Sequence, residues 1–120
     1  MAKHDQYQQH YGCPVEATLD MIGGKWKGML IYHLLQGTQR FNALRRAFPG
    51  VTQRMLTKQL RELESVGLVH REVFAEVPPR VEYSLTARGE SLRPVIGVLE
   101  AWGATHALPT FAARRQSETA

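Results

Sequence analysis

The chain has 120 residues, which is the size of one domain. Hydrophobic residues make up 43% of it and charged residues 22%, a balance that excludes disordered, collagen-like and disulfide-scaffolded proteins. The 15 lysines and arginines exceed the 11 aspartates and glutamates and give a net charge of +4, which permits a polyanionic partner without requiring one.

The N-terminal sequence and the cysteine count predict a cytoplasmic protein. Residues 1–11 are polar and glutamine-rich, so they lack the apolar stretch of a signal peptide. No apolar run approaches the ~20 residues that a membrane span needs. Cys13 is the single cysteine of the chain and cannot form an internal disulfide. We expect a small domain whose limited core is supplemented by oligomerisation.

Two helices are predicted near the N-terminus, after a flexible arm over residues 1–12. Pro14 opens the first helix, because a proline at the first helical position loses no hydrogen bond. Gly23 and Gly24 end this helix. Apolar residues at helical spacing predict the second helix, over residues 25–35.

The skeleton of a helix-turn-helix is predicted next. A short helix over residues 40–48 is closed by Pro49 and Gly50. Thr52 is a suitable N-cap for the following helix, over residues 53–65. Two short helices separated by a tight turn are typical of this motif.

The period of the apolar residues then changes from helical to strand-like. Residues 68–74 and 80–85 are rich in β-branched and aromatic residues and predict a hairpin, which a loop containing two prolines joins. Thr86 is expected to cap a long last helix that ends near residue 108. Pro94 is expected to kink this helix or to mark a break in it.

This order of elements predicts a mainly α (α+β) fold, a winged helix-turn-helix with a two-stranded wing. An apolar stripe on the last helix, together with the first helix, is expected to form a dimer. The domain is predicted over residues 13–108, followed by a flexible C-terminal tail over residues 109–120 that is small and polar.

The helix over residues 53–65 has one cationic face. Its stripe that is predicted to be buried holds Leu56, Leu60 and Leu63. The opposite face carries Arg54, Thr57, Lys58 and Arg61. Cations there can neutralise phosphates or reach guanine acceptors in a major groove, and Thr52 and Gln53 lie where the helix N-terminus also favours phosphate. A solvated, salt-bridged surface is the alternative for such a face.

The hairpin adds further cations, and these favour DNA as the partner. Arg71 lies in its first strand and Arg80 beside its loop. Arg80 is a candidate for a minor-groove or phosphate contact. The alternative for Arg80 is an ion pair with Glu82 or Glu76.

Several blocks of the sequence resemble the HxlR-type family of bacterial transcription regulators. These blocks are CPVE at 13–16, LDMIGGKW at 19–26, RFNAL at 40–44, RMLT at 54–57, LRELE at 60–64, GLV at 67–69, PRVEYSLT at 79–86 and Gly89. They span most of the chain, and jointly they are far more specific than any one block. Gly28 departs mildly from the family, in which a bulkier residue is common at this position.

The resemblance implies a dimeric winged helix that binds pseudo-palindromic operators and represses or activates nearby genes. In that family the first and last helices form the dimer. Several members sense electrophiles, quinones or hypochlorite through an N-terminal cysteine followed by proline, which is where Cys13 stands.

A redox role for Cys13 is physically reasonable, because a helix N-terminus favours a thiolate and Lys25 and Lys27 follow nearby in the sequence. Oxidation would give a sulfenic acid and then a mixed or intersubunit disulfide. The alternative is an inert cysteine packed at the dimer interface.

Other chemistry finds little support in the sequence. His4, His10 and Cys13 match no metal-ligand spacing, and no cofactor is expected. The chain lacks phosphate-loop, nucleophile-elbow and HExxH motifs, which argues against an enzyme. Trp26, Phe41, Phe48 and Trp102 are expected in packing, with a small effector cavity at the dimer interface as the alternative.

The predicted function is therefore a dimeric, sequence-specific DNA-binding regulator, expected to be a repressor and to respond to an oxidant or electrophile through Cys13. Its partners would be double-stranded operator DNA and a second copy, with no membrane. The alternative is a winged-helix module that binds protein or RNA and has no sensory cysteine.

Overall fold

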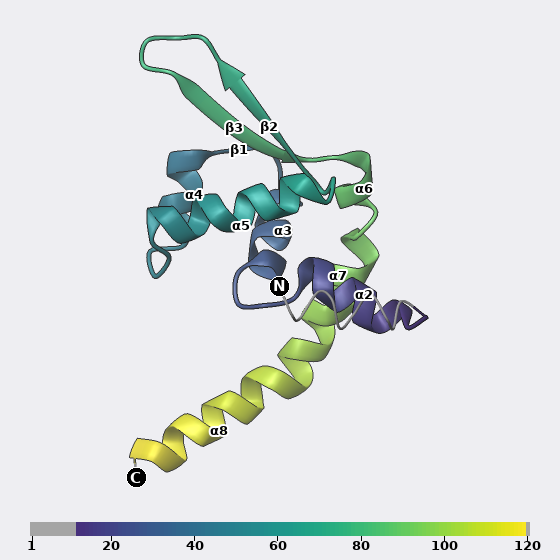
Figure 1. Ribbon diagram of the computed structural model, residues 1–120. Helices are drawn as coiled ribbons and strands as arrows, with labels where there is room; N and C mark the ends of the chain where they lie inside the picture. The colour runs from purple at the N-terminus through teal and green to yellow at the C-terminus, as the bar shows by residue number, and fades with distance from the viewer. Residues whose placement is uncertain (1–11, 120) are drawn as a thin grey trace. The chain divides into compact units, whose positions relative to one another are not determined.

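The computed structural model describes residues 12–119, which divide into two units. The first ends at Glu90 and the second begins at Ser91, and each is described by itself. All but Gly12 of the expected flexible arm lies outside the described residues. The elements of the first unit are α2 (Pro14–Ile22), α3 (Lys27–Leu34), β1 (Gln39–Arg40), α4 (Phe41–Ala47), α5 (Gln53–Ser65), β2 (Val69–Phe74), β3 (Arg80–Leu85) and α6 (Ala87–Glu90), as Figure 1 shows.

The helices α4 and α5 form the predicted helix-turn-helix pair. The N–H of Val51 donates to the carbonyl oxygen of Phe48 at 3.1 Å and closes the turn between them. The N–H of Met55 donates to Thr52 Oγ1 at 3.1 Å, which is the N-cap bond that the sequence predicts. Gly67 has a φ of +78° just after α5, a conformation that favours glycine at the end of a helix.

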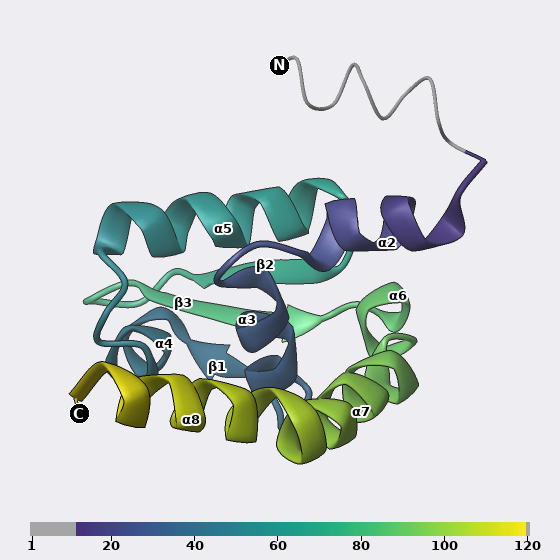
Figure 2. The same cartoon turned by 90° about the horizontal axis from the view of Figure 1, so that it is seen from below.

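Buried leucines fix α5 to the rest of the first unit. Leu56, Leu60 and Leu63 are each at most 1% exposed, as the sequence predicts. Burying a leucine stabilises a fold by about 1.5–3 kcal/mol, so this stripe decides which side of α5 faces inward. Figure 2 shows α5 running alongside β2, which it contacts. The other core residues of the unit are Ile22, Leu30, Ile31, Leu34, Leu44, Leu68, Val69 and Tyr83.

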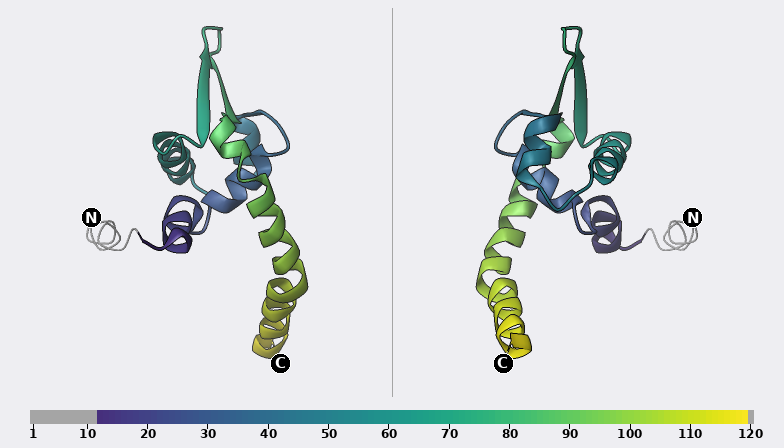
Figure 3. Two further views of the ribbon diagram at one scale, coloured as in Figure 1. Left: turned by 90° about the vertical axis from the view of Figure 1, so that its right-hand side faces the viewer. Right: turned by 90° about the vertical axis from the view of Figure 1, so that its left-hand side faces the viewer.

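The sheet contains one strand more than the sequence predicts. Its order is β1-β3-β2, with β3 antiparallel to both neighbours. The third strand, β1, pairs Gln39 with Tyr83 and Arg40 with Glu82. A strand of two residues has no alternation to detect, so only the pairing with β3 reveals it. The expected hairpin of β2 and β3 is present, and Figure 3 shows it edge-on, projecting beyond the helices of the first unit.

The last helix is broken shortly before Pro94, where the sequence predicts a kink or a break. Thr86 does cap its start, because the N–H of Gly89 donates to Thr86 Oγ1 at 3.0 Å. This first segment, α6, ends at Glu90, and α7 (Arg93–Trp102) begins anew with Pro94 in its first turn. Proline suits that position because the N–H that it lacks would be unpaired there. Of the two alternatives for Pro94, the structure shows the break.

The second unit continues as helix where the sequence predicts a flexible tail. After α7 come a π-helical turn, η1 (Gly103–Ala107), and α8 (Leu108–Thr119). Pro109 cannot donate to a carbonyl one turn earlier, and the wider π-helical turn lies at that point. Residues 112–116 are alanine, arginine and glutamine, which favour helix strongly. Pro109 and the polar residues after it suggest a flexible tail, but the helix propensity of residues 112–116 agrees with the helix that the structure shows.

Candidate nucleic-acid interface

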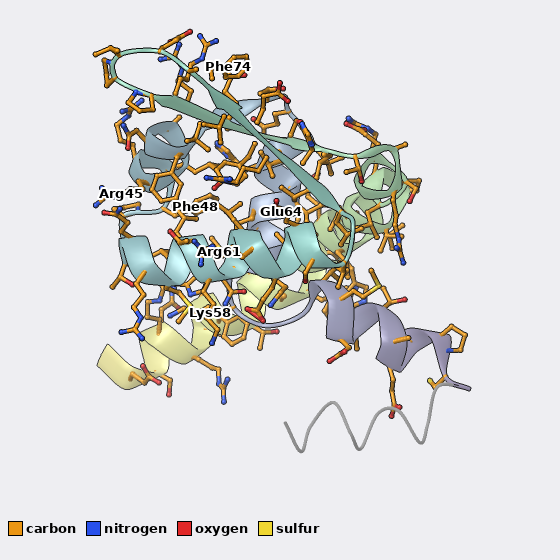
Figure 4. The ribbon with its side chains drawn as sticks, turned by 45° about the horizontal axis from the view of Figure 1, so that its top comes forward. Arg45, Phe48, Lys58, Arg61, Glu64 and Phe74 are labelled. Carbon is orange, nitrogen blue, oxygen red and sulfur yellow. The ribbon has the colours of Figure 1, made fainter. Side chains whose placement is uncertain are left out.

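The outward face of α5 is cationic. Arg54, Lys58 and Arg61 are exposed, and Thr57 between them is half-buried. Figure 4 shows Lys58 and Arg61 standing out from α5. Gln53 and the capping Thr52 are exposed at the start of the helix. The split between a buried leucine stripe and a cationic face is the one that the sequence predicts.

The cations on this face have no partner within the described part of the chain. The side chains of Arg54, Lys58 and Arg61 make no hydrogen bond, ion pair or ring contact with another residue between 12 and 119. A salt-bridged surface, the alternative for this face, requires such pairs. Because the cations are unpaired, they can neutralise phosphates without first breaking a contact within the protein.

A half-buried lysine from α3 contacts α5 on its inner side. Lys27 is 16% exposed, and its Nζ donates to Gln59 Oε1 at 3.0 Å and lies 3.6 Å from Glu62 Oε1. Gln59 Nε2 in turn donates to the sulfur of Met55 at 3.3 Å. Sequence reasoning considered Lys27 only as a neighbour of Cys13. The partners lie 32 and 35 positions away along the chain, so no local pattern signals this contact.

A groove lies between α5, the start of α4 and the hairpin. Its lining includes Thr57 and Arg61 from α5, and Asn42 from α4. The strands contribute the cations Arg40, Arg71 and Arg80. Arg40 was not among the predicted site residues, because it stands in the strand that the sequence does not reveal. The groove joins the cationic face of α5 to the hairpin.

The guanidinium of Arg80 is engaged within the hairpin. Its Nη2 lies 3.2 Å from Glu76 Oε1, and its Nε lies 3.3 Å from Glu82 Oε2. The guanidinium carbon also lies 4.1 Å from the centroid of the Phe74 ring, which is a cation–π distance. The ion-pair alternative for Arg80 is therefore present, with both carboxylates at once. A DNA contact by Arg80 stays a prediction.

Cys13 is exposed and stands at the N-cap of α2. Its backbone is extended, with φ −102° and ψ 106°, and Pro14 follows in the first turn. The two lysines that were expected near it have other contacts, since Lys27 holds α5 and Lys25 Nζ lies 5.0 Å from the Trp26 ring centroid. Cys13 is therefore exposed in the single chain, and the alternative of an inert cysteine packed at the dimer interface stays a prediction.

The histidines and aromatic residues show no ligand site in the described residues. His4 and His10 lie outside them, and residues 12–119 hold no cluster of three groups that could bind a metal ion. Phe41 packs against the ring of Tyr83 and Phe48 against the ring of His33, as expected.

No helix within residues 12–119 is long and apolar enough to cross a membrane.

Each unit also exposes apolar side chains. On α2, Val15 and Leu19 are 66% and 57% exposed. In the second unit Trp102 is 62% exposed and stacks only on His106, with 4.9 Å between the ring centroids. The other exposed apolar residues of that unit are Val95, Val98, Leu99, Leu108 and Phe111. Surfaces of this kind on a small domain indicate an interface.

Comparisons with known proteins identify the family of the chain. Residues 21–110 match the family model of the HxlR-like helix-turn-helix. The HTH-type transcriptional regulators YybR and YdeP of Bacillus subtilis are 58% and 63% identical, over 84% and 77% of this chain and 81% and 72% of theirs. The redox regulator HypR in its reduced form is 56% identical, with a TM-score of 0.77 over 82% of this chain and 99% of that chain.

The same regulator in its oxidised form is 60% identical, with a TM-score of 0.74 over 78% of this chain and 97% of that chain. These relatives are transcriptional regulators rather than enzymes. The chain thus belongs to the HxlR-like helix-turn-helix family of DNA-binding transcriptional regulators.

Proposed function

We propose that this regulator is a homodimeric repressor in the cytoplasm, that it binds operator DNA through α5 and the hairpin, and that oxidation of Cys13 releases it. The observation that carries the DNA contact is the unpaired cationic face of α5. On this proposal α5 enters a major groove, and its contacts come from Thr52, Gln53, Arg54, Thr57, Lys58 and Arg61. From the sequence, Arg80 is the residue of the hairpin that is predicted to contact the minor groove or a phosphate.

The dimer is proposed to form through α2 and the helices of the second unit. Both carry exposed apolar side chains, which a second copy would remove from water at about 25 cal/mol per Å². Two copies related by a two-fold axis would read a pseudo-palindrome whose half-sites lie about one helical turn apart. Occupying such a site within a promoter would exclude the transcription machinery, which is the basis for proposing a repressor.

The oxidant response is proposed to run through Cys13. Hydrogen peroxide would transfer an oxygen to the thiol, giving a sulfenic acid and releasing water. The thiol of a second copy would then attack the sulfenic sulfur, form an intersubunit disulfide and release a second water. The exposed position of Cys13 and the similarity to the redox regulator HypR support this step. A disulfide between the two α2 helices would change the spacing of the two α5 helices and release the operator.

DNA binding is tested by titrating the chain with the intergenic DNA upstream of its own gene. We expect specific binding that is at least ~10³-fold tighter than binding to a mixed-sequence duplex, and that weakens steeply with salt. An affinity that does not change with salt concentration, or that is higher for single-stranded RNA than for the duplex, would instead support the protein- or RNA-binding alternative.

The redox role is tested with Cys13→Ser and the thiol oxidant diamide. Diamide is expected to release the wild-type chain from its operator and to give a dimer band on a non-reducing gel, whereas the Cys13→Ser chain stays bound and gives no such band. Equal release of both chains by diamide would show that Cys13 does not carry the response.

A further inference from the structure

The two faces of the hairpin differ in chemistry. Residues directly opposite each other on antiparallel strands point to the same face, and successive residues alternate between faces. The register pairs Arg71 with Tyr83, Glu72 with Glu82 and Phe74 with Arg80. Arg71 therefore shares one face with Tyr83, and Arg80 shares the other with Glu82 and Phe74.

The face that carries Arg80 is occupied by contacts within the protein. His70 Nε2 and Glu72 Oε2 are 2.8 Å apart. Arg80 lies against Glu76 and Glu82 and stacks on the Phe74 ring. Its side chain is 26% exposed. For Arg80 to reach a phosphate, two ion pairs and the ring contact would have to be given up.

The face that carries Arg71 lies toward the helices. Tyr83, on the same face, is 5% exposed, and its ring lies 6.3 Å from that of Phe41 in α4. Arg71 itself is exposed and, within residues 12–119, its guanidinium has no hydrogen bond, ion pair or ring contact. It lines the groove that Thr57 and Arg61 of α5 also line. Arg80 lines this groove too, but unlike Arg71 it is held in ion pairs with Glu76 and Glu82. Arg71 is thus a free cation that continues the cationic face of α5.

We propose that Arg71 is the residue of the hairpin that contacts the DNA backbone, and that Arg80 positions the hairpin without contacting DNA. This inference rests on the proposed function, because it places a phosphate of the operator in the groove between α5 and the hairpin. When Arg71 contacts that phosphate, its guanidinium gives up hydrating water but breaks no contact with another described residue. Arg80 ties β3 to the loop through Glu76 and stiffens the hairpin that carries Arg71.

The test is the salt dependence of binding to a fluorescently labelled mixed-sequence duplex, for which every contact is to the backbone. The binding constant falls with salt, and each phosphate contact adds ~0.9 to the steepness of log K against log salt. Removing one contact therefore makes this slope shallower by ~0.9 and weakens binding about eightfold at ~0.1 M salt. Arg71→Ala is expected to show both changes. Arg71→Lys keeps the charge and is expected to retain the slope.

Arg80 is tested by neutralising its whole contact set, with Arg80→Met, Glu76→Gln and Glu82→Gln combined. The two glutamines keep the length of the glutamates, the methionine keeps an unbranched apolar stem, and neither Glu76 nor Glu82 is left as an unpaired carboxylate, so the slope is expected to stay at the wild-type value. Lys25→Ala, which removes an exposed charge beside Trp26, is the control for net charge alone. Circular dichroism checks that each variant is folded.

The proposal is overturned if Arg71→Ala leaves the salt slope unchanged. It is also overturned if the combined Arg80→Met, Glu76→Gln and Glu82→Gln variant makes the slope shallower by ~0.9, the amount for one phosphate contact. Either result would leave the proposed function standing, provided that the wild-type chain binds duplex. Failure of the wild-type chain to bind any duplex would reject the proposed function and this inference with it.

Discussion

The helix-turn-helix of the first unit and the helices of the second unit expose different kinds of side chain. The first unit buries the leucines of α3 and α5, and the cations of α5 have no partner among the described residues. The second unit exposes Trp102, Leu108 and Phe111 at more than half of their surface. A surface of unpaired cations suits a polyanion, whereas a surface of exposed apolar residues suits a second protein surface. The difference predicts that substitutions can separate DNA binding from the proposed dimer formation.

The largest effect is expected in the core of the first unit. Leu60→Ala removes a side chain that is 0% exposed, and it should lower the free energy of unfolding by about 2–5 kcal/mol. Urea unfolding at fixed protein concentration measures it. Val98→Ala, at a 68% exposed position of the second unit, is the control. Similar losses for both variants at a concentration where the chain is monomeric would break the comparison.

The next effect concerns the dimer. Trp102→Ala is expected to raise the dimer dissociation constant ~30-fold or more, because exposed aromatic residues at the centre of an interface contribute at least ~2 kcal/mol. Sedimentation at several concentrations measures it. Glu100→Ala, an exposed polar position of the same helix, should leave the constant within about twofold. A dimer that tolerates Trp102→Ala would show that the second unit's apolar surface has another partner.

The smallest effect sharpens the comparison at the N-terminus of α5. Thr52→Ala removes the acceptor for the N–H of Met55 and should lower the free energy of unfolding by about 1 kcal/mol. Thr52→Ser keeps a capping hydroxyl and should restore most of that stability. If the alanine and serine variants unfold at the same urea concentration, the hydroxyl contributes nothing to α5.

Sequence reasoning succeeds where the signal is local. The limits of α5, its cap at Thr52 and its leucine stripe all follow from spacing along one helix, and the structure confirms them. The strand β1 is missed because it exists only through its pairing with β3. The extent of α8 is missed because Pro109 suggests an end, while the π-helical turn before it accommodates the proline.

The candidate site divides in the same way. Which face of α5 is outward can be predicted from the sequence, because the leucines fix it. Which of the cations are free is decided only by the structure. Lys27 is held by Gln59 and Glu62 of α5, which are distant in the sequence. Arg80 is held by Glu76 and Glu82, the ion pairs that the sequence offers as the alternative to a DNA contact. The sequence singles out Arg80 for DNA, whereas the strand register and these pairs distinguish it from Arg71.

The central claim is that the unpaired cations of α5 bind duplex DNA, and one titration tests it most directly. The double variant Arg54→Glu and Lys58→Glu is compared with the wild-type chain on the upstream intergenic duplex at several salt concentrations. We predict that the double variant binds at least ~60-fold more weakly at ~0.1 M salt, because two contacts of about eightfold each are lost. The salt dependence of its binding should also be shallower, by the amount expected for about two phosphate contacts. Wild-type affinity and slope in the double variant would contradict it.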